Sequence, residues 1–408
     1  MVPPRVHGKA KLWPSYQFLL SMPAMAIWQF NLRHLAAVAR IAELGTINAA
    51  AQAVNLTQPA ITQALARIES LLGLPLFERR HDGMAPTGAA LMLVPRIEAA
   101  LAHIASTNVT MARLRALLAL ADTGSYAGAS ATTGLAVPSI HRAVNDLALG
   151  MRRDLVERRG KAVMLTEAGQ ALARAFRLAR VELETGLSEI DALKGHETRA
   201  IAIGAMPLSR ARVLPAAVTR FLRRHPQVRL GIAEGSRAEL VEPLRNGALD
   251  LMIGALRDPL IEADLAQSPL FDDVPVVIAR TGHPLAGTDP DPAALAAFPW
   301  TVPGTGAPLR DSFERFFANA GVARPAVPIE SGSVMMIRQI LIDSDFLTML
   351  SPDQVAAEID AGWLVRVTSL PAQLSRTIGV TTRASWRPTT VQQEFLSDLA
   401  AAAGDMGG

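Results

Sequence analysis

Residues 55–73 read NLTQPAITQALARIESLLG and contain signals that begin, orient and end a helix. The hydroxyl of Thr57 can accept a hydrogen bond from a backbone N–H at the helix start. Pro59 is tolerated in the first turn, because its missing N–H would have no partner there. Gly73 is a suitable C-terminal stop. Apolar residues recur on one face at spacings of 4, 3 and 4, namely Ile61, Leu65, Ile68 and Leu72. The stretch therefore predicts a helix with one buried stripe.

The other face of this helix is polar near its N-terminus, where the helix dipole also favours anions. Side chains able to bond base edges or phosphates lie there: Gln58, Thr62, Gln63 and Arg67. Upstream, Gly45 ends a first helix and Thr46 can cap a second, so three helices form a helix-turn-helix. Downstream, Arg79 and Arg80 flank a glycine turn, as in a basic β-wing. From periodicity alone, a helical core with a charged loop fits equally well.

The order of these features resembles the N-terminal domain of LysR-type transcriptional regulators across GTINAAAQAVNLTQPAITQALARIESLLGLPLFERR, residues 45–80. The resemblance implies that the capped helix is a recognition helix, and that Arg79 and Arg80 lie in a wing. Together, the resemblance and the polar face give these DNA-binding candidates for the first unit: Thr57, Gln58, Pro59, Thr62, Gln63, Arg67, Arg79 and Arg80.

A second copy of the unit lies 79 residues further along, where GLAVPSIHRAVNDLALG aligns Pro138 with Pro59. Residues 45–80 then fall on residues 124–159 without a gap. The apolar stripe recurs as Ile140, Val144, Leu147 and Met151. The sequence therefore predicts a second winged helix-turn-helix.

The second copy has lost part of its DNA chemistry. Ala136 replaces the capping Thr57, and Asp146, which repels phosphate, replaces Arg67. Its remaining DNA-binding candidates are His141, Arg142, Arg158 and Arg159. Three roles stay open for this copy: a grip on the DNA backbone, a true base reader, or a surface for protein contact.

A long near-heptad stripe follows the second copy, at Leu172, Phe176, Ala179, Leu183, Leu187, Ile190 and Leu193. By resemblance, it indicates the dimerising linker helix of the family; a helix packed on its own chain is the alternative. The expected organisation is a disordered or mis-started leader, two winged units, the linker helix and an effector-binding domain, at residues 1–27, 28–110, 111–165, 166–197 and 198–408.

From residue 199 the pattern alternates strand and helix in two successive sets, which indicates two α/β lobes with a cleft between them. This region resembles the effector-binding domain of the same family, most clearly in LRNGALDLMIGA, residues 244–255. Polar turns at expected strand ends could hold a small organic acid or other oxyanion. The effector-binding candidates are Ser209, Ser236, Thr305, Ser331 and Ser333. For any one of them, capping its own helix is the simpler role.

Composition narrows the function further. The 408 residues include no cysteine, which excludes disulfides, zinc–thiolate sites and thiol catalysis. Residues 1–197 hold 21 Lys and Arg against 15 Asp and Glu, whereas residues 198–408 hold 19 against 22. The first half is therefore the more basic one, which permits a nucleic-acid partner there. We find no apolar run long enough to cross a bilayer, and no P-loop, dinucleotide, nucleophile-elbow or zinc-helix motif.

The sequence thus predicts a cytoplasmic, homodimeric or homotetrameric regulator with a mixed fold, two α-helical winged units and a two-lobed α/β domain. We expect this regulator to bind promoter DNA and to sense a small molecule. RNA polymerase is a further candidate partner. No cofactor, metal or membrane association is expected. The rival classes are a two-lobed solute-binding or transport component and, less well supported, an enzyme without a recognisable motif.

Overall fold

The computed structural model describes residues 27–106, 109–159, 162–196 and 200–405. Most of the leader expected at residues 1–27 lies outside this range. The chain divides into two compact units, residues 1–200 and, apart from 246–248, residues 201–408. Within the described residues, no helix is both long and apolar enough to span a membrane.

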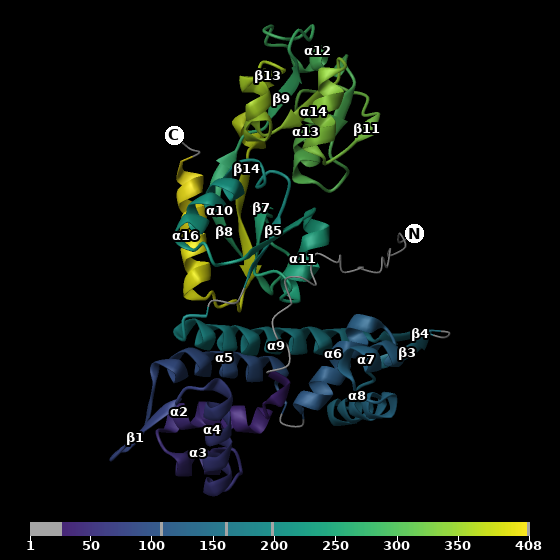
Figure 1. Ribbon diagram of the computed structural model, residues 1–408. Helices are drawn as coiled ribbons and strands as arrows, with labels where there is room; N and C mark the ends of the chain where they lie inside the picture. Colours follow the sequence, from purple (N-terminus) through teal and green to yellow (C-terminus); the bar gives the residue numbers. More distant parts are fainter. Residues whose placement is uncertain (1–26, 107–108, 160–161, 197–199, 406–408) are drawn as a thin grey trace. The chain divides into compact units, whose positions relative to one another are not determined.

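The first unit begins with one helical head and its wing (Figure 1). A short 3₁₀ helix, Ile27–Gln29, precedes it. Its elements are α2 (Leu32–Leu44), α3 (Ile47–Ala53), α4 (Gln58–Leu72), β1 (Phe77–Arg80), β2 (Gly83–Pro86) and α5 (Gly88–Ile104). Asn31, Thr46, Thr57 and Thr87 each accept a backbone hydrogen bond at the start of a helix. These caps explain why the helices begin where they do.

The second head repeats this order along the chain. Its elements are α6 (Met111–Thr123), α7 (Tyr126–Thr133), α8 (Val137–Met151), β3 (Val156–Arg159), β4 (Ala162–Leu165) and α9 (Glu167–Leu193). Both wings are antiparallel hairpins, and both pair in equivalent register: Phe77 lies opposite Pro86, and Val156 opposite Leu165. The duplication seen in the sequence is therefore a duplication of structure.

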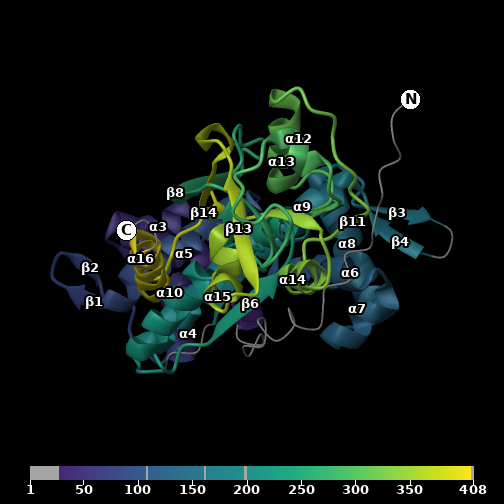
Figure 2. The same cartoon turned by 90° about the horizontal axis from the view of Figure 1, so that it is seen from above.

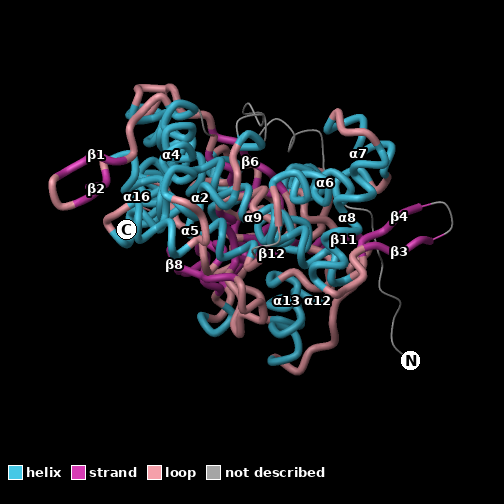
Figure 3. Tube along the Cα trace, turned by 90° about the horizontal axis from the view of Figure 1, so that it is seen from below, coloured by secondary structure: helices cyan, strands magenta, loops and turns pink. Residues whose placement is uncertain are grey.

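Helices α5 and α9 pack side by side and join the two heads into one body. Leu93, early in α5, lies against Gly186, late in α9, so the helices run antiparallel. The wing β1–β2 lies at one end of the pair and the wing β3–β4 at the other, as Figures 2 and 3 also show. The middle of the apolar stripe expected for the linker helix is thus buried within the chain at Phe176, Ala179, Leu183 and Ile190, whereas Leu172 and Leu187 are half-buried and Leu193 is exposed.

A buried ion cluster lies on this helix pair. The Arg96 guanidinium donates to Glu182 at 3.1 Å and to Glu189 at 2.8 Å. Side chains of all three residues are at most 13% exposed. Burial disfavours the charged guanidinium, but the hydrogen bonds and charges of Glu189 and Glu182 outweigh it and raise the pKa of Arg96.

The second unit consists of two α/β lobes. The first lobe has a sheet of strand order β6-β5-β7-β14-β8, in which β5 runs parallel to β6 and β7. Its elements are β5 (Ile201–Ala205), α10 (Val213–Arg224), β6 (Leu230–Glu234), α11 (Arg237–Arg245), β7 (Leu251–Ala255), β8 (Leu265–Asp273), β14 (Arg376–Arg383) and α16 (Thr390–Gly404).

The second lobe has the strand order β11-β10-β12-β9-β13 around a buried Trp300, whose ring packs against Phe313 and Phe317. Its strands are β9 (Val276–Arg280), β10 (Trp300–Val302), β11 (Ile329–Glu330), β12 (Leu347–Leu350) and β13 (Leu364–Ser369). Its helices are α12 (Pro292–Ala296), α13 (Pro308–Asn319), α14 (Val334–Ile342), η2 (Pro352–Val355), α15 (Ala356–Asp360) and η3 (Ala372–Leu374).

The chain crosses between the lobes at two neighbouring places, from β8 to β9 and from β13 to β14. An ion pair ties these crossings together, since Arg376 Nε donates to Asp273 at 2.8 Å. Both side chains are largely buried. The crossings therefore form one connection from which both lobes project.

Candidate DNA-binding surfaces and effector cleft

The structure of α4 matches its sequence pattern. Ile61, Leu65, Ile68 and Leu72 are buried. Gln58, Gln63 and Arg67 are exposed on the polar side, with Thr57 and Pro59 at the exposed start. Thr62 is half-buried, and its hydroxyl donates to the Gln58 carbonyl at 3.0 Å.

A groove of about 220 Å³ brings part of the predicted set together. It is lined by Gln58 from α4, Arg79 and Arg80 from the wing, and Thr46 to Asn48 at the start of α3. Two helix starts and two guanidinium groups therefore face one space, which suits an anionic backbone. Sequence reasoning did not identify Thr46 to Asn48 as part of this surface, although the cap at Thr46 was visible.

The wing is fixed to the head by a close backbone contact. Met84 N donates to the Gly45 carbonyl at 2.7 Å. Gly83 has a φ of +142°, and a Cβ added there would lie 2.4 Å from Gly45 O. This approach requires glycine, and it sets the position of Arg79 and Arg80 beside α4.

Two positions that correspond in the two heads carry different charges. In the first head, burial lowers the pKa of His34, and the positive charge of Arg67 lowers it further. In the second head, these positions are Arg113 and Asp146, and they form an ion pair at 2.9 Å. Asp146 therefore has a partner of opposite charge within its own head, which the sequence alone did not indicate.

The remaining predicted residues of the second head lie on α8 and the wing. No side chain caps α8, as expected from Ala136. His141 stacks on Tyr126 with ring centroids 3.5 Å apart, whereas Arg142 and Arg158 are exposed. Arg159 belongs to β3, and its side chain lies outside the described part of the chain.

The effector-binding candidates of the first lobe follow neighbouring parallel strands. Ser209 comes after β5, is fully buried, and donates its hydroxyl to the Met206 carbonyl at 2.8 Å. Ser236 comes after β6 and is exposed. Its backbone N–H and its hydroxyl both donate to Glu239 at 2.8 Å, which lowers the pKa of that carboxyl. Both serines thus have local partners.

The candidates of the second lobe also gather at neighbouring strand ends, because β10 and β11 are parallel. Thr305 follows β10 and is exposed. Ser331 follows β11, and its hydroxyl accepts a hydrogen bond from Ser333 N at 3.1 Å. Ser333 caps α14 by accepting from Met336 N.

The turns of the two lobes face each other. Arg257, after β7, donates to the Gly306 carbonyl after β10 at 3.0 Å. Arg212, before α10, pairs with Asp353 after β12 at 3.0 Å. Carboxyl-terminal strand ends of both lobes therefore border one cleft, where ligands of open α/β folds bind.

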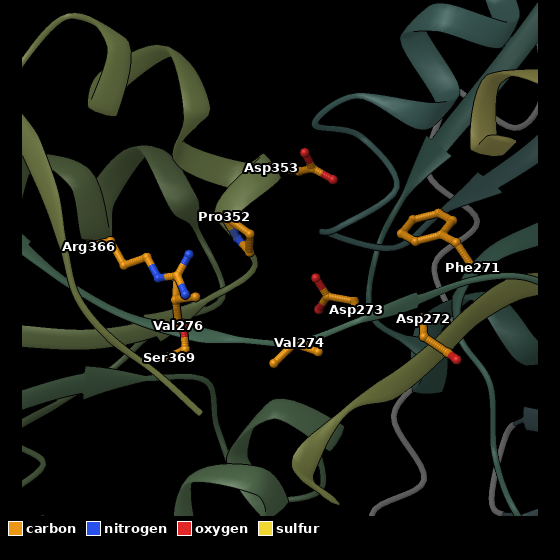
Figure 4. Close-up of a pocket in the computed structure, with 9 residues that line it drawn as sticks. All are labelled: Phe271, Asp272, Asp273, Val274, Val276, Pro352, Asp353, Arg366 and Ser369. Atoms are coloured by element: carbon orange, nitrogen blue, oxygen red, sulfur yellow. The ribbon is translucent and has the colours of Figure 1, made fainter. Parts of the chain in front are cut away.

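A cavity of about 300 Å³ lies beside this cleft, near the two crossings. Figure 4 shows the Arg366 guanidinium extending toward the side that carries Asp273 and Asp353. Its lining residues are Phe271, Asp272, Asp273, Val274, Val276, Pro352, Asp353, Arg366 and Ser369. Sequence reasoning missed this cavity, because its walls come from three separate segments, 271–276, 352–353 and 366–369, and no motif marks them.

Among the described residues, no group of three or more His, Asp and Glu side chains could hold a metal ion.

Comparison with known proteins identifies the family. Residues 32–91 and 111–170 each match the bacterial regulatory helix-turn-helix protein, lysR family. Residues 194–404 match the LysR substrate binding domain. The chain belongs to the LysR family of transcriptional regulators. Two helix-turn-helix matches in one chain favour a regulator over a two-lobed solute-binding component.

Similar proteins agree with this LysR assignment. The chain is 32% identical over 366 residues to the HTH-type transcriptional regulator GalR of Pseudomonas putida, covering 86% of this chain and 92% of that protein. It is 33% identical over 272 residues to the SDS degradation transcriptional activation protein of a Pseudomonas species, covering 65% and 86%. The full-length LysR-type regulator LysG of Corynebacterium glutamicum has a similar fold, with a TM-score of 0.54, 18% identity, and coverage of 72% and 97%.

The Gly83–Gly45 contact predicts the behaviour of a single variant of this LysR-family chain. Gly83→Ala should displace the first wing and weaken DNA binding about ten-fold, which is ~1.4 kcal/mol. Gly88→Ala is the matched control, because a Cβ there meets nothing within 4 Å. Gel shifts and limited proteolysis of the wing measure the effect. Equal binding by both variants would contradict the proposed docking of the wing.

Proposed function

We propose that the first head of this regulator reads promoter DNA through the N-terminal half of α4. The groove that joins Gln58, Arg79 and Arg80 carries this proposal. Exposed polar side chains on α4 suit base edges in the major groove, whereas the wing arginines suit phosphates. Thr57, Pro59, Thr62, Gln63 and Arg67 complete the surface.

The second head is proposed to hold the DNA backbone with little base reading. The Tyr126 ring covers part of His141, and the Arg113–Asp146 pair neutralises charge beside α8. The wing keeps Arg158 and Arg159, which suit phosphate. Sequence-independent affinity is therefore the function that these residues favour.

The two-lobed domain is proposed to bind a small organic acid or other oxyanion at the facing turns. Thr305 and Ser333 lie before α13 and α14, whose N-terminal N–H groups favour anions. Binding there would shift the lobes and change the affinity of the heads for DNA. The regulator would act in the cytoplasm as a homodimer or homotetramer, without catalytic activity, and RNA polymerase is its further partner.

Base reading by α4 predicts a loss of sequence preference. Gln58→Ala with Thr62→Ala should abolish specific binding and leave oligomerisation unchanged, since each base contact contributes about 1–3 kcal/mol. Gel shifts with an operator selected from a random DNA pool, compared with unrelated DNA, test this. Unaltered preference in the double variant would remove α4 from the reading surface.

The proposed role of the second head predicts that variants of its wing change the overall affinity for DNA rather than the sequence preference. Arg158→Ala with Arg159→Ala should weaken binding to all sequences and flatten the dependence of affinity on salt, because phosphate contacts release counterions. His141→Ala with Arg142→Ala should leave the sequence preference nearly unchanged. If the His141→Ala/Arg142→Ala variant loses its preference at defined bases, the second head reads DNA sequence. If neither double variant changes DNA binding, the second head is a spacer or a protein-contact surface.

The proposed effector site predicts that variants there lose the response to the effector but keep DNA binding. Thr305→Val and Ser333→Ala should blunt the thermal stabilisation by small carboxylates and keep DNA binding without effector. Removing the Ser333 cap also costs about 0.5–2 kcal/mol of stability. Thr389→Ala is the matched control, since Thr389 caps α16 in the first lobe. A normal carboxylate response in both cleft variants places the effector elsewhere.

A further inference from the structure

The structural repeat extends beyond the two wings into α5 and α9. Thr87 and Thr166, separated by the same 79 residues, cap these helices. The Thr87 hydroxyl donates to the Pro75 carbonyl at 2.9 Å, and the Thr166 hydroxyl donates to the Asp154 carbonyl at 2.6 Å. Asp154 also follows Pro75 by 79 residues. Helices α5 and α9 are therefore the same element of the two copies.

Equivalent positions of the two helices enter one shared core. Ile97, Ala100 and Ile104 of α5 are each at most 3% exposed, and they join the same apolar cluster as α9. Shifting these positions by 79 gives Phe176, Ala179 and Leu183, which are equally buried there. Each copy thus offers its partner the same face, as in a two-fold interface.

The ion cluster breaks this symmetry. By the 79-residue offset, Arg96 corresponds to Ala175, and Glu182 corresponds to His103. Pairing α9 with another α9 in the same way would bury Glu182 and Glu189 without Arg96. Pairing α5 with another α5 would bury Arg96 without those carboxylates. Since a buried charge without its partner is strongly destabilising, the cluster favours α5 with α9 over either like pair.

We infer that each chain carries its own pair of DNA-binding heads, fixed at the two ends of the α5–α9 pair. The 27 residues of α9 span about 40 Å, so the pair is long enough to hold the two heads apart at its two ends. One chain thus binds duplex DNA with two unlike half-sites, one read by α4 and one held through phosphates. This inference rests on the proposed function of both heads.

Engineered cysteines test the pairing, because the natural chain has none. A Cβ at residue 186 would lie 2.8 Å from Leu93 Cδ1, so side chains at these two positions meet across the helix pair. The full-length double variant Leu93→Cys/Gly186→Cys should therefore form a disulfide within one chain on mild oxidation. Leu93→Cys alone and Gly186→Cys alone are the matched controls, and both should remain single chains on a denaturing, non-reducing gel. Covalent dimers from the double variant or from either control would overturn the inference.

A second set of variants avoids the close contact at Gly186. Arg96→Met alone should lower the melting temperature sharply, because it leaves Glu182 and Glu189 buried without a cation. Adding Glu182→Gln and Glu189→Gln should recover most of this loss. An Arg96→Met variant that melts like the natural chain would show that the cluster does not select the pairing.

DNA binding by the locked chain separates this inference from the proposed function. The oxidised and reduced double variants should give the same hydroxyl-radical footprint on a duplex selected by the natural protein, with affinities within about two-fold. Binding only in the reduced form would overturn the intramolecular pairing on DNA. Loss of binding in both forms, with the natural protein still bound, would contradict the proposed function, and the gel result would then decide the pairing alone.

Discussion

The Arg96 guanidinium lies buried against two carboxylates of α9, and the arrangement of the first unit depends on this cluster. Small and branched apolar residues along α5 and α9 would allow several registers of packing, because their contacts are not directional. A buried cation without its anions costs several kcal/mol, so only a register that joins Arg96 to Glu182 and Glu189 is favourable. That register sets where the two heads lie.

Local signals made the heads predictable from the sequence. The cap at Thr57, the stripe from Ile61 to Leu72 and the repeat at Pro138 each depend on residues close together in the chain. Helix α5 was not predicted, although Thr87 aligns with Thr166 at the same offset; Pro95 within the helix weakens its pattern. Periodicity shows which face of α9 is buried, but it does not show what covers that face. The choice between pairing within or between chains therefore needed the structure.

For the polar residues of the cleft too, the sequence shows their positions along the chain but not their contacts. Strand and helix alternation predicted two lobes, and the polar turns do follow the carboxyl ends of parallel strands. A serine in such a turn can serve a ligand or its own backbone, and only coordinates separate the two. Ser209 is fully buried against Met206, whereas Thr305 is exposed at the cleft. The cavity beside Arg366 had no sequence signal, because its walls meet only after folding.

The two heads differ in their DNA-binding chemistry, and we attribute this difference to their connection within one chain. Under the proposed function, binding of α4 to its half-site would confine the second head near the adjacent turn of DNA, so its effective concentration would be high and weak contacts would suffice. Phosphate contacts from Arg158 and Arg159 can then contribute without base reading. The absent side-chain cap at Ala136 and the neutralised charge of Asp146, which pairs with Arg113, fit this weaker role for α8. In the first head the equivalent positions are His34 and Arg67; burial and the charge of Arg67 favour the neutral form of His34, so Arg67 carries the positive charge beside α4 without an acidic partner at the equivalent position.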